Sequence, residues 1–360
     1  MIPTARPLRA AIVGLGGIFK HHLHALHAAC GVELAAVCDL DPARVAAATD
    51  GQTIAGFSSL QEMLEKCRPD ILTIATENRS HAPLTLLAAA AGVRAIHCEK
   101  PMAVHPREAR AMVAACQSAG TLLTVNHQRR VADAGVRAFI AAGGIGDLLE
   151  LRGYCAGDLL SDGTHLIDSL LALAGDPLVT SVNAGIDLSA MTERYGHPVE
   201  SGACATFDCP AGPLISIATG SFAARRVYQE YHVTGSRGSL IRIGDRAPNW
   251  FIADGKPGTH ALAFNRQLWH LLPTATPEGG PWRLLEETNA NPHEAGARIY
   301  EAIAHSLAHG SPHPLDGRRT LQVQDLIAAC QLSGATRRPT EVAACADLDY
   351  LPLTAISHTL

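Results

Sequence analysis

The residues best suited to chemistry in this sequence are a charged pair followed by a proline, Glu99-Lys100-Pro101. They end a short apolar run, residues 95–98, which predicts a β-strand. Pro101 restricts Lys100 to extended geometry and ends the strand ladder, so the lysine is held at the carboxyl end of a strand. Open parallel sheets bind ligands at that edge, where a lysine can polarise or deprotonate a hydroxyl group. The alternative is an ordinary surface ion pair in a loop.

A second polar pair, His165 and Asp168, lies in a stretch from Thr164 to Ala174 that predicts a helix. A spacing of three puts both side chains on one helix face. The other residues of this helix are mostly apolar, so a buried helix would point its polar stripe at a cavity. We therefore expect His165 to be an acid–base group that Asp168 orients. Alternatively, His165 caps the helix and Asp168 satisfies a neighbouring backbone group.

The elements before Lys100 follow the order of a dinucleotide-binding unit. An apolar strand over residues 9–13 ends at Gly14-Leu15-Gly16-Gly17, a helix follows over 18–29, and a second strand over 33–38 ends at Asp39. The acid lies roughly 20 to 25 residues past the glycines, as this fingerprint expects. Gly14 permits the tight turn, and Gly16 lets the backbone approach a pyrophosphate at the helix N-terminus. Phe19 holds the third glycine position, so we expect the helix to lie slightly farther from the strand.

Asp39 indicates which cofactor is bound. It ends the second strand and can accept hydrogen bonds from a ribose diol, whereas Asp41-Pro42 is typical of a helix N-cap and first turn. A carboxylate at position 39 would repel a 2′-phosphate, and Arg44 lies farther along, on the next helix. NAD is therefore predicted over NADP.

The rest of the first half continues the alternation of strands and helices. Strands are predicted over 71–75, 93–98 and 121–125, with a helix between successive strands. This order implies a doubly wound parallel sheet with right-handed crossovers. The loops after its strands converge on one edge, which favours a functional Lys100 over a surface ion pair. These loops carry Gly14, Asp39, Asn78, Lys100 and Asn126.

Composition excludes several classes of protein. The 360 residues are 47% hydrophobic and 18% charged, with a net charge of -5, which is typical of a folded globular protein of two domains. No basic run suggests nucleic acid, and no apolar run reaches the roughly 20 residues of a membrane span. We find no signal peptide in residues 1–9 and expect ten free thiols and a cytoplasmic protein.

Histidines crowd the first predicted helix. His24 and His27 could share a face, but no acid or cysteine accompanies them, so no metal site is predicted. We interpret these side chains as helix-surface and packing residues, and the same interpretation covers His21 and His22.

Seven segments give the chain a resemblance to the glucose–fructose oxidoreductase / inositol dehydrogenase / rhizopine-catabolism family of NAD(P)-dependent oxidoreductases. The segments are Gly14-Leu15-Gly16, Thr76 to Ala82, Cys98 to Ala103, Val125 to Arg130, Gly146-Asp147, Gly163 to Asp168 and Ala329 to Pro339. The most specific feature is the pairing of Glu-Lys-Pro with Gly-x-His-x-x-Asp at this separation. Together the segments cover most of the chain.

The resemblance implies a dinucleotide domain followed by an α/β domain with a large, mostly antiparallel sheet, whose face often forms the oligomer contact. It implies that Lys100 lies beside the nicotinamide and the reacting hydroxyl, with a cis peptide between Lys100 and Pro101. Many relatives carry an aspartate four residues before the histidine. Here that position is Ser161, and Asp162 is one place away, which leaves a carboxylate-assisted relay open; Asp162 could equally be an N-cap.

The second half supports this architecture. Strands are predicted over 148–155, 179–186, 203–207, 214–219 and 228–234, and the closing helix over 318–333. Residues 246–291 lack periodicity and hold all three tryptophans, which suggests an active-site flap or an oligomer arm. We expect a dinucleotide domain over residues 1–127 and a substrate-binding and oligomerisation domain over 128–360, with the last helices packing back on the first domain.

We therefore predict an NAD(P)-dependent dehydrogenase that moves hydride between nicotinamide and a secondary alcohol of a sugar, cyclitol or polyol, in a homodimer or homotetramer. The predicted catalytic residues are Lys100, His165 and Asp168. The predicted cofactor site comprises Gly14, Gly16, Gly17, Ile18, Asp39, Thr76, Asn78, His81, Glu99 and Lys100, with Glu99 in a supporting role. The predicted substrate-binding residues are Asn126, His127, Arg129 and Asp162.

Two other functions fit the same residues. One is cleavage of glycosides by transient oxidation with tightly held NAD and no net redox change, and the other is non-enzymatic NAD sensing. The sequence leaves open which sugar or cyclitol is used and in which direction the reaction runs.

Overall fold

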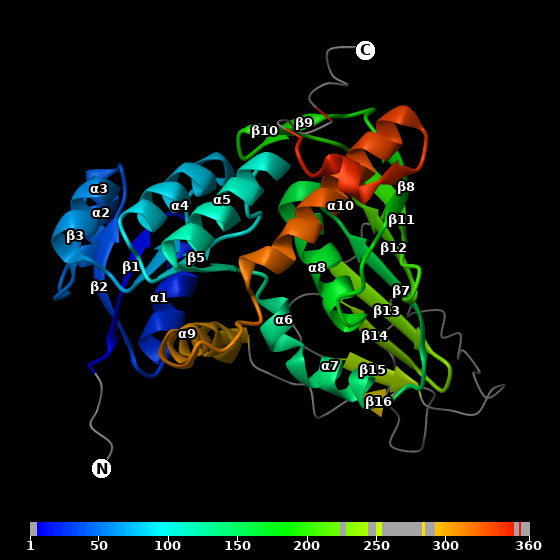
Figure 1. Cartoon of the computed structure of the whole chain (residues 1–360), viewed down its shortest axis with the longest axis horizontal. Coiled ribbons are helices and arrows are strands. Elements are labelled where there is room, and N and C mark those ends of the chain that lie inside the picture. The colour runs from blue at the N-terminus through cyan, green and yellow to red at the C-terminus, as the bar shows by residue number, and fades with distance from the viewer. Residues whose placement is uncertain are drawn as a thin grey trace, which may run out of the picture.

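The structure, a computed structural model, describes residues 6–223, 228–243, 250–253, 283–284 and 292–348, and residue 353. The first half of the chain forms a six-stranded parallel sheet in the order β3-β2-β1-β4-β5-β6 (Figure 1). Its strands are β1 (Leu8–Val13), β2 (Val32–Cys38), β3 (Ala55–Phe57), β4 (Ile71–Ile74), β5 (Ala95–Cys98) and β6 (Leu122–Val125). This is the doubly wound sheet that the alternation of strands and helices predicts.

Helices follow the strands of this sheet as crossovers. They are α1 (Phe19–Ala28), α2 (Pro42–Thr49), α3 (Leu60–Cys67), α4 (His81–Ala90) and α5 (Pro106–Ala119), with a short 3-10 turn, η1 (Asn78–Ser80), before α4. The strand order reverses direction between β1 and β4, which is the switch point where such sheets bind ligands. The cofactor is therefore expected at the carboxyl ends of β1 and β4.

The strand register brings the predicted site residues to one edge. Val13 pairs with Ile74, Ile74 with Cys98, and Cys98 with Val125, so four neighbouring strands end at the same level. The residue that follows each strand therefore lies at the same edge of the sheet, and these residues include Gly14, Glu99 and Asn126.

The second half contains a nine-stranded sheet in the order β16-β15-β14-β13-β7-β12-β11-β8-β17. Its pairings are antiparallel except for the parallel pair β7 and β12, so the expected mostly antiparallel sheet is confirmed. Its strands are β7 (Leu148–Cys155), β8 (Ser181–Asp187), β11 (Gly202–Asp208), β12 (Leu214–Thr219), β13 (Gln229–Gly235), β14 (Ser239–Ile243), β15 (Trp250–Ala253), β16 (Arg283–Leu284) and β17 (Thr340–Glu341).

Helices cover one face of this sheet and return to the first half. They are α6 (Arg129–Ala132), α7 (Ala134–Ala141), α8 (Thr164–Leu173), α9 (Pro292–His309) and α10 (Gly317–Thr336), and a π-helical turn, η2 (Leu159–Gly163), precedes α8. Side chains of α8 and α10 share a core with β7, β11 and β12. Two 3-10 turns, η3 (Gly220–Phe222) and η5 (Val342–Cys345), complete this half.

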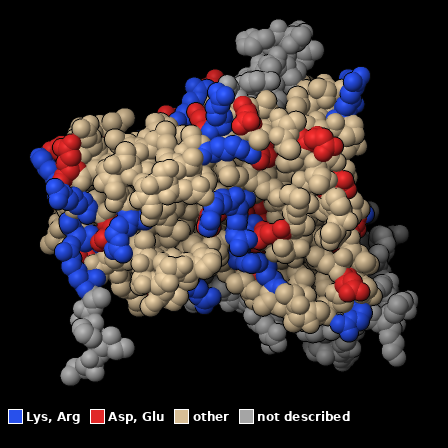
Figure 2. Space-filling view, viewed as in Figure 1, with Lys and Arg blue, Asp and Glu red and all other residues tan. Residues whose placement is uncertain are grey.

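The closing helices join the two halves. Ile299 and Ile303 of α9 pack with Ala25 and Leu26 of α1 in one buried cluster, and α9 lies beside α1 in Figure 1. Basic and acidic side chains lie close together along the junction of the two lobes on the face shown in Figure 2. Asp325 of α10 accepts two hydrogen bonds from the guanidinium of Arg110 in α5, at 2.8 and 2.7 Å.

A small hairpin projects from the second half toward the first. It consists of β9 (Thr192–Arg194) and β10 (His197–Val199), joined by a turn in which Tyr195 and Gly196 have positive φ angles of 48° and 79°. Two consecutive left-handed residues suit a tight hairpin turn, and glycine takes the second position without steric cost.

Some expectations fall partly or wholly outside the described residues. Of the aperiodic segment 246–291, only β15 and β16 are described, so no flap or arm is assigned; Trp269 and Trp282 lie outside the described residues. Trp250 is buried, and its indole N–H donates to Asp133 at 3.0 Å. All ten cysteines are free thiols. Among the helices that the structure describes, none is long and apolar enough to cross a membrane.

Candidate functional site

The glycine-rich turn after β1 is shaped by close packing on one side and open space on the other. Gly14 has φ 94°, and a Cβ atom there would lie 2.4 Å from the carbonyl oxygen of Ala75, so only glycine fits. By contrast, Cβ atoms at Gly16 and Gly17 would meet no atom within 4 Å. The backbone at these two residues, at the start of α1, is therefore accessible to an anion.

Asp39 closes this turn from the end of β2. Its carboxylate accepts hydrogen bonds from the main-chain N–H of Leu15 at 2.7 Å and of Asp41 at 2.9 Å. The Asp41 side chain accepts from Ala43 N–H at 2.9 Å, which confirms its predicted role as the N-cap of α2. Arg44, expected to be remote, lies with its guanidinium 3.7 Å from the Asp39 carboxylate.

Two predicted cofactor residues after β4, His81 and Asn78, make different contacts. His81 is fully buried, and its ring nitrogens lie 2.8 Å from the Pro101 carbonyl and 3.2 Å from the Thr76 carbonyl. These contacts tie α4 to the loop after Lys100, so His81 supports the site from beneath and does not face a ligand. Asn78 reaches the hairpin, with its amide nitrogen 3.1 Å from His197 Nε2.

Lys100 connects the two halves of the molecule. The peptide bond between Lys100 and Pro101 is cis, as expected. The Lys100 ammonium donates a hydrogen bond to the main-chain carbonyl of Ser161 in the π-helical turn, at 2.8 Å. The lysine at the end of β5 therefore stands directly opposite the turn that leads into α8.

Glu99 points the other way, into the first half. Its carboxylate accepts from His22 Nε2 at 2.8 Å, from the Asn126 amide at 2.6 Å and from the Lys100 main-chain N–H at 3.2 Å. Burial acts to raise the pKa of Glu99, but the hydrogen bonds and charges of His22, Asn126 and Lys100 outweigh it and lower the pKa to about 2. Glu99 is thus ionised and supports its neighbours, as predicted.

His165 and His127 lie together in the buried wall opposite Lys100. Their rings form an edge-to-face pair with centroids 5.6 Å apart. Burial is the largest cause that lowers the pKa of both rings, and Arg129 and Lys100 lower both further. Among the described residues, His165 Nδ1 and both His127 ring nitrogens have no hydrogen-bond partner. Two neutral imidazoles with unused nitrogens are thus available to a ligand.

Asp168 contacts a different group from the one predicted. Its carboxylate accepts from Arg130 Nε at 2.8 and 3.0 Å, and Arg130 also pairs with Asp176 at 2.7 Å. Because both partners are almost fully buried, this ion pair occupies the carboxylate. His165 lies within α8 after Gly163 at its N-cap, so neither the orienting contact nor the helix-capping alternative is observed.

The π-helical turn explains the displaced aspartate. In this turn the main-chain N–H of Gly163 donates to the Asp158 carbonyl at 2.8 Å, a hydrogen bond that spans one residue more than in an α-helix. Asp158 caps this turn, whereas Asp162 lies inside it, so the N-cap alternative for Asp162 is wrong. Asp162 accepts from Arg194 of the hairpin at 2.5 Å and from the Tyr228 hydroxyl.

Two residues of this region were not predicted. His22 was interpreted as a surface or packing residue, but it is buried against Glu99; its spacing from Phe19 and Leu26, both buried, was the available signal. Arg194 lies in a hairpin whose three-residue strands leave little pattern in the sequence.

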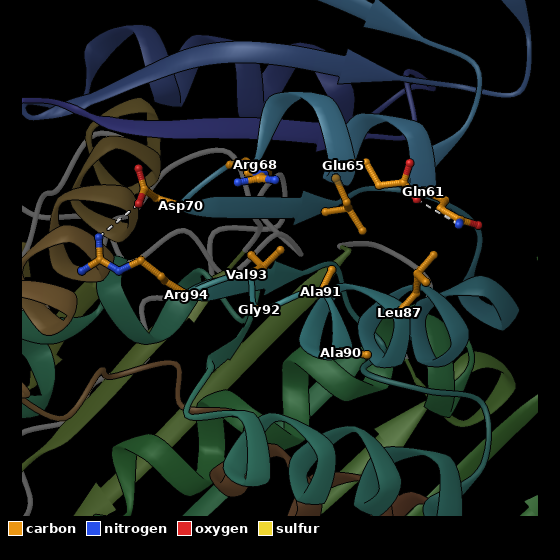
Figure 3. A pocket seen from close by; sticks show the side chains of 12 residues that line it. Gln61, Glu65, Arg68, Asp70, Leu87, Ala90, Ala91, Gly92, Val93 and Arg94 are labelled. Atoms are coloured by element: carbon orange, nitrogen blue, oxygen red, sulfur yellow. Dashed lines mark hydrogen bonds and ion pairs between the residues drawn. The ribbon is translucent and has the colours of Figure 1, made fainter.

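A hollow elsewhere on the first half is not part of this site. It measures about 750 Å³ and lies between the ends of α3 and α4 and the starts of β4 and β5 (Figure 3). An ion pair between Asp70 and Arg94, 3.1 Å long, spans one side of it. Because it lies where the parallel strands begin, it is on the opposite edge of the sheet from Lys100.

The described residues fit a dinucleotide. The open backbone at Gly16 and Gly17 beside the start of α1 suits a pyrophosphate, and the Asp39 carboxylate suits ribose hydroxyls. Asn126 Oδ1 is buried without a hydrogen-bond partner in the described part of the chain, which leaves it for a ligand beside Lys100. Fold and site together define an NAD-binding Rossmann oxidoreductase.

Comparison with known proteins gives the particular family. Residues 8–127 match the family model described as oxidoreductase family, NAD-binding Rossmann fold, and residues 155–342 match that of the C-terminal alpha/beta domain. The chain therefore belongs to the Gfo/Idh/MocA oxidoreductase family, as its sequence motifs indicate, and it is an NAD(P)-dependent oxidoreductase.

The relatives include sugar and inositol dehydrogenases. The chain is 33% identical to D-apiose dehydrogenase of Rhizobium rhizogenes, over 94% of this chain and 98% of that protein. It is 28% identical to D-apiose dehydrogenase of Paraburkholderia graminis, over 94% of this chain and 91% of that protein. The structure of levoglucosan dehydrogenase in complex with NADH shares the fold, with a TM-score of 0.78, 19% identity, and coverage of 93% of this chain and 99% of that one.

Proposed function

We propose that this protein oxidises a secondary alcohol of a sugar, cyclitol or related polyol and passes the hydride to NAD. The observation that carries the proposal is the position of Lys100, at the carboxyl edge of the parallel sheet and 2.8 Å from the turn that leads to His165. An amine and an imidazole would thus lie at the nicotinamide end of the proposed cofactor site. Sugar dehydrogenases among the relatives support this substrate class.

The protein groups would divide the proton chemistry between them. NAD supplies the hydride acceptor when bound. Lys100 donates a hydrogen bond to the substrate oxygen and stabilises the negative charge that develops as its proton leaves. His165, which burial keeps uncharged, accepts that proton.

Substrate hydroxyls would be held by the polar groups around Lys100. Asn126 Oδ1 and the two His127 nitrogens lack hydrogen-bond partners in the described residues, and Arg129 is buried nearby. Asp162 would act through Arg194 and Tyr228, which it already binds. Asp168 would hold Arg130 beneath this wall, which replaces the orienting role predicted for it.

NAD is proposed as the preferred cofactor because Asp39 ends β2 beside the glycine-rich turn, where its carboxylate would accept hydrogen bonds from ribose hydroxyls. Two main-chain N–H groups hold this carboxylate in place. Arg44 offsets part of the repulsion toward a 2′-phosphate, since its guanidinium lies 3.7 Å away and is half exposed. Steady-state rates with NAD and NADP in parallel test this preference, and Asp39→Ala should raise the relative rate with NADP.

For the whole molecule, we propose domains over residues 1–127 and 128–360 and a homodimer or homotetramer. Support for the assembly comes from β7 and β12, where Leu149 and Leu214 are each 52% exposed among the residues that the structure describes. A hollow of about 270 Å³ is lined by both strands. Light scattering after size-exclusion chromatography would measure the mass, and a monomer at micromolar concentration would contradict the proposal.

The test of function is a substrate panel followed by nicotinamide absorbance. It should include D-apiose, levoglucosan, inositols and glucosides, each with NAD and with NADP. NADH formation from at least one polyol is expected. Product formation from glycosides without added cofactor would instead indicate cleavage with no net redox change, and a blank panel from protein that binds NADH would indicate a sensor.

A further inference from the structure

A chain of buried hydrogen bonds extends from Glu99 away from the substrate side. His22 Nε2 lies 2.8 Å from the Glu99 carboxylate, and His22 Nδ1 lies 2.8 Å from the Tyr300 hydroxyl. The Tyr300 hydroxyl in turn lies 2.9 Å from the hydroxyl of Thr73. All four residues are buried, and they come from β4, the end of β5, α1 and α9. The contact between α1 and α9 therefore has a polar centre.

The ionised state of Glu99 sets the direction of this chain. A carboxylate only accepts, so His22 Nε2 carries a proton and donates it. In a singly protonated ring, Nδ1 then accepts from the Tyr300 O–H. Burial raises the pKa of Tyr300, so its proton is retained, and its oxygen accepts from the Thr73 hydroxyl. Each link is satisfied in this one direction.

The neighbouring titratable groups do not add charge to the chain. Burial lowers the pKa of His97 to about 3 and of His313 to about 4, and it also lowers the pKa of His81. These rings are neutral at pH 7. The groups that lower the pKa of Glu99 are therefore His22, Asn126 and Lys100.

At its other end the chain reaches groups that face the ligand. Glu99 accepts from the Asn126 amide at 2.6 Å, which fixes that side chain and leaves Oδ1 as its free acceptor. Glu99 also accepts from the Lys100 main-chain N–H at 3.2 Å. A carboxylate held by three donors thus sets the orientation of one proposed substrate ligand and of the backbone that carries the proposed catalytic amine.

We propose that His22 and Tyr300 are positioning residues for hydride transfer: they hold Glu99 in the geometry that aligns Asn126 and Lys100 with the substrate hydroxyls. The inference rests on the proposed function. It assigns a role in the reaction to a side chain of α9, which lies 200 residues beyond Lys100 in sequence. Neither residue touches the substrate.

Matched substitutions separate positioning from stability. Tyr300→Phe removes only the hydroxyl and should lower kcat roughly 10- to 100-fold, because misplacement by about 1 Å can cost that much. Thr73→Val should lower kcat by a smaller factor, whereas Thr121→Val serves as the control. Thr121 is also buried, and its hydroxyl donates to the Val93 carbonyl at 2.7 Å at the far end of the sheet. The dissociation constant for NADH should stay within about twofold of wild type in all three variants, since none touches the glycine turn.

His22 provides a rescue experiment. His22→Gln keeps one N–H donor for Glu99 and should recover kcat by roughly tenfold over His22→Ala. Equal activity of the two variants would overturn the proposal, and so would a loss in Thr121→Val as large as in Thr73→Val. Wild-type kcat in Tyr300→Phe would overturn it as well.

A spectroscopic readout keeps this inference separate from the proposed function. The ring 15N shifts of His22, assigned by their loss in His22→Gln, should show a proton on Nε2, and Tyr300→Phe should shift the Nδ1 signal. This result is expected even from a protein that oxidises no polyol on the panel. A proton on Nδ1 in the wild type would refute the chain itself.

Discussion

At the scale of single residues, the site depends on two neighbours that point in opposite directions. Successive side chains alternate across a strand, and this alternation continues past the end of β5. Glu99 is buried against His22 and Asn126, whereas Lys100 reaches across to Ser161 of the second half. One strand end therefore supplies both an internal support and a group for chemistry.

The first prediction at this scale concerns Lys100→Ala. NAD should still bind, because the contacts of Gly14 and Asp39 are untouched, but kcat should fall by about 10² to 10⁴, the usual contribution of a positioned acid–base group. NADH fluorescence and steady-state rates measure the two effects. Lys66→Ala is the control, since Lys66 is exposed and pairs with Glu62 on α3. Unchanged turnover in Lys100→Ala would remove the lysine from the mechanism.

The second prediction concerns Asp168. Asp168→Ala leaves the buried guanidinium of Arg130 with only Asp176 as a carboxylate partner, and it should lower the free energy of unfolding by about 3 kcal/mol. Asp176→Ala should cost less, because that carboxylate is more exposed. Urea unfolding measures both. If Asp168→Ala kept wild-type stability and lost only kcat, the orienting role toward His165 would be favoured instead.

At the scale of elements, most of the fold could be predicted because hydrophobic periodicity and glycine turns act locally. The bounds of β7 and β12 agree with prediction, and the predicted helix over 18–29 is α1 to within one residue at each end. Gly14, Asp39 and Lys100 could be placed at one edge because parallel strands that end in register bring their loops together.

The contacts that could not be predicted join residues distant in sequence. Asp168 binds Arg130, 38 residues away, and His81 binds the carbonyl of Pro101, 20 residues away. The π-helical turn was missed because its geometry differs from an α-helix by a single residue, which leaves the apolar pattern nearly unchanged.

The third prediction belongs to the β9–β10 hairpin. Arg194 pairs with Asp158 at 2.8 Å and with Asp162 at 2.5 Å, while His197 reaches Asn78 in the expected cofactor loop. Arg194→Ala leaves two buried carboxylates without their shared guanidinium and should raise the KM for the sugar about tenfold, with a smaller change for NAD. The control is R94A, which removes an arginine whose ion pair with Asp70 is more exposed and lies on the opposite edge of the sheet. Equal KM values in both variants would exclude a role for the hairpin in substrate binding.

At the scale of the whole molecule, two buried carboxyl groups, Glu99 and Glu200, make the free energy of unfolding depend on pH in opposite directions and in separate pH ranges. Glu99 has its pKa lowered to about 2, so its contribution is complete above about 4.5 and is lost as pH falls toward 2. Burial raises the pKa of Glu200 from 4.5 to about 7, although a hydrogen bond from Leu159 N–H opposes this. Between pH 4.5 and about pH 7 the folded protein keeps the Glu200 proton and the unfolded chain loses it. The free energy of unfolding therefore falls as pH rises through this range.

The fourth prediction follows from Glu200. Glu200→Gln stays uncharged, so its free energy of unfolding relative to wild type should rise by about 3 kcal/mol between pH 5 and pH 8. Comparing the two proteins removes the contributions of the histidines, which also titrate in this range. Urea unfolding at four pH values measures the difference, and Glu193→Gln, on the exposed side of the hairpin, should give a flat line. A flat line for Glu200→Gln would show that the Glu200 pKa is not raised.

The acceptor of the Lys100 hydrogen bond is a main-chain carbonyl, and this has a consequence for genetics. Every amino acid at position 161 supplies the same oxygen, so no substitution there can delete the bond. A complete mutational scan would therefore score position 161 only for the size its buried side chain allows, and this hydrogen bond would leave its mark at Lys100 alone. Replacing the amide after Ser161 by an ester, which weakens the carbonyl as an acceptor and changes no side chain, is the substitution that would reveal it.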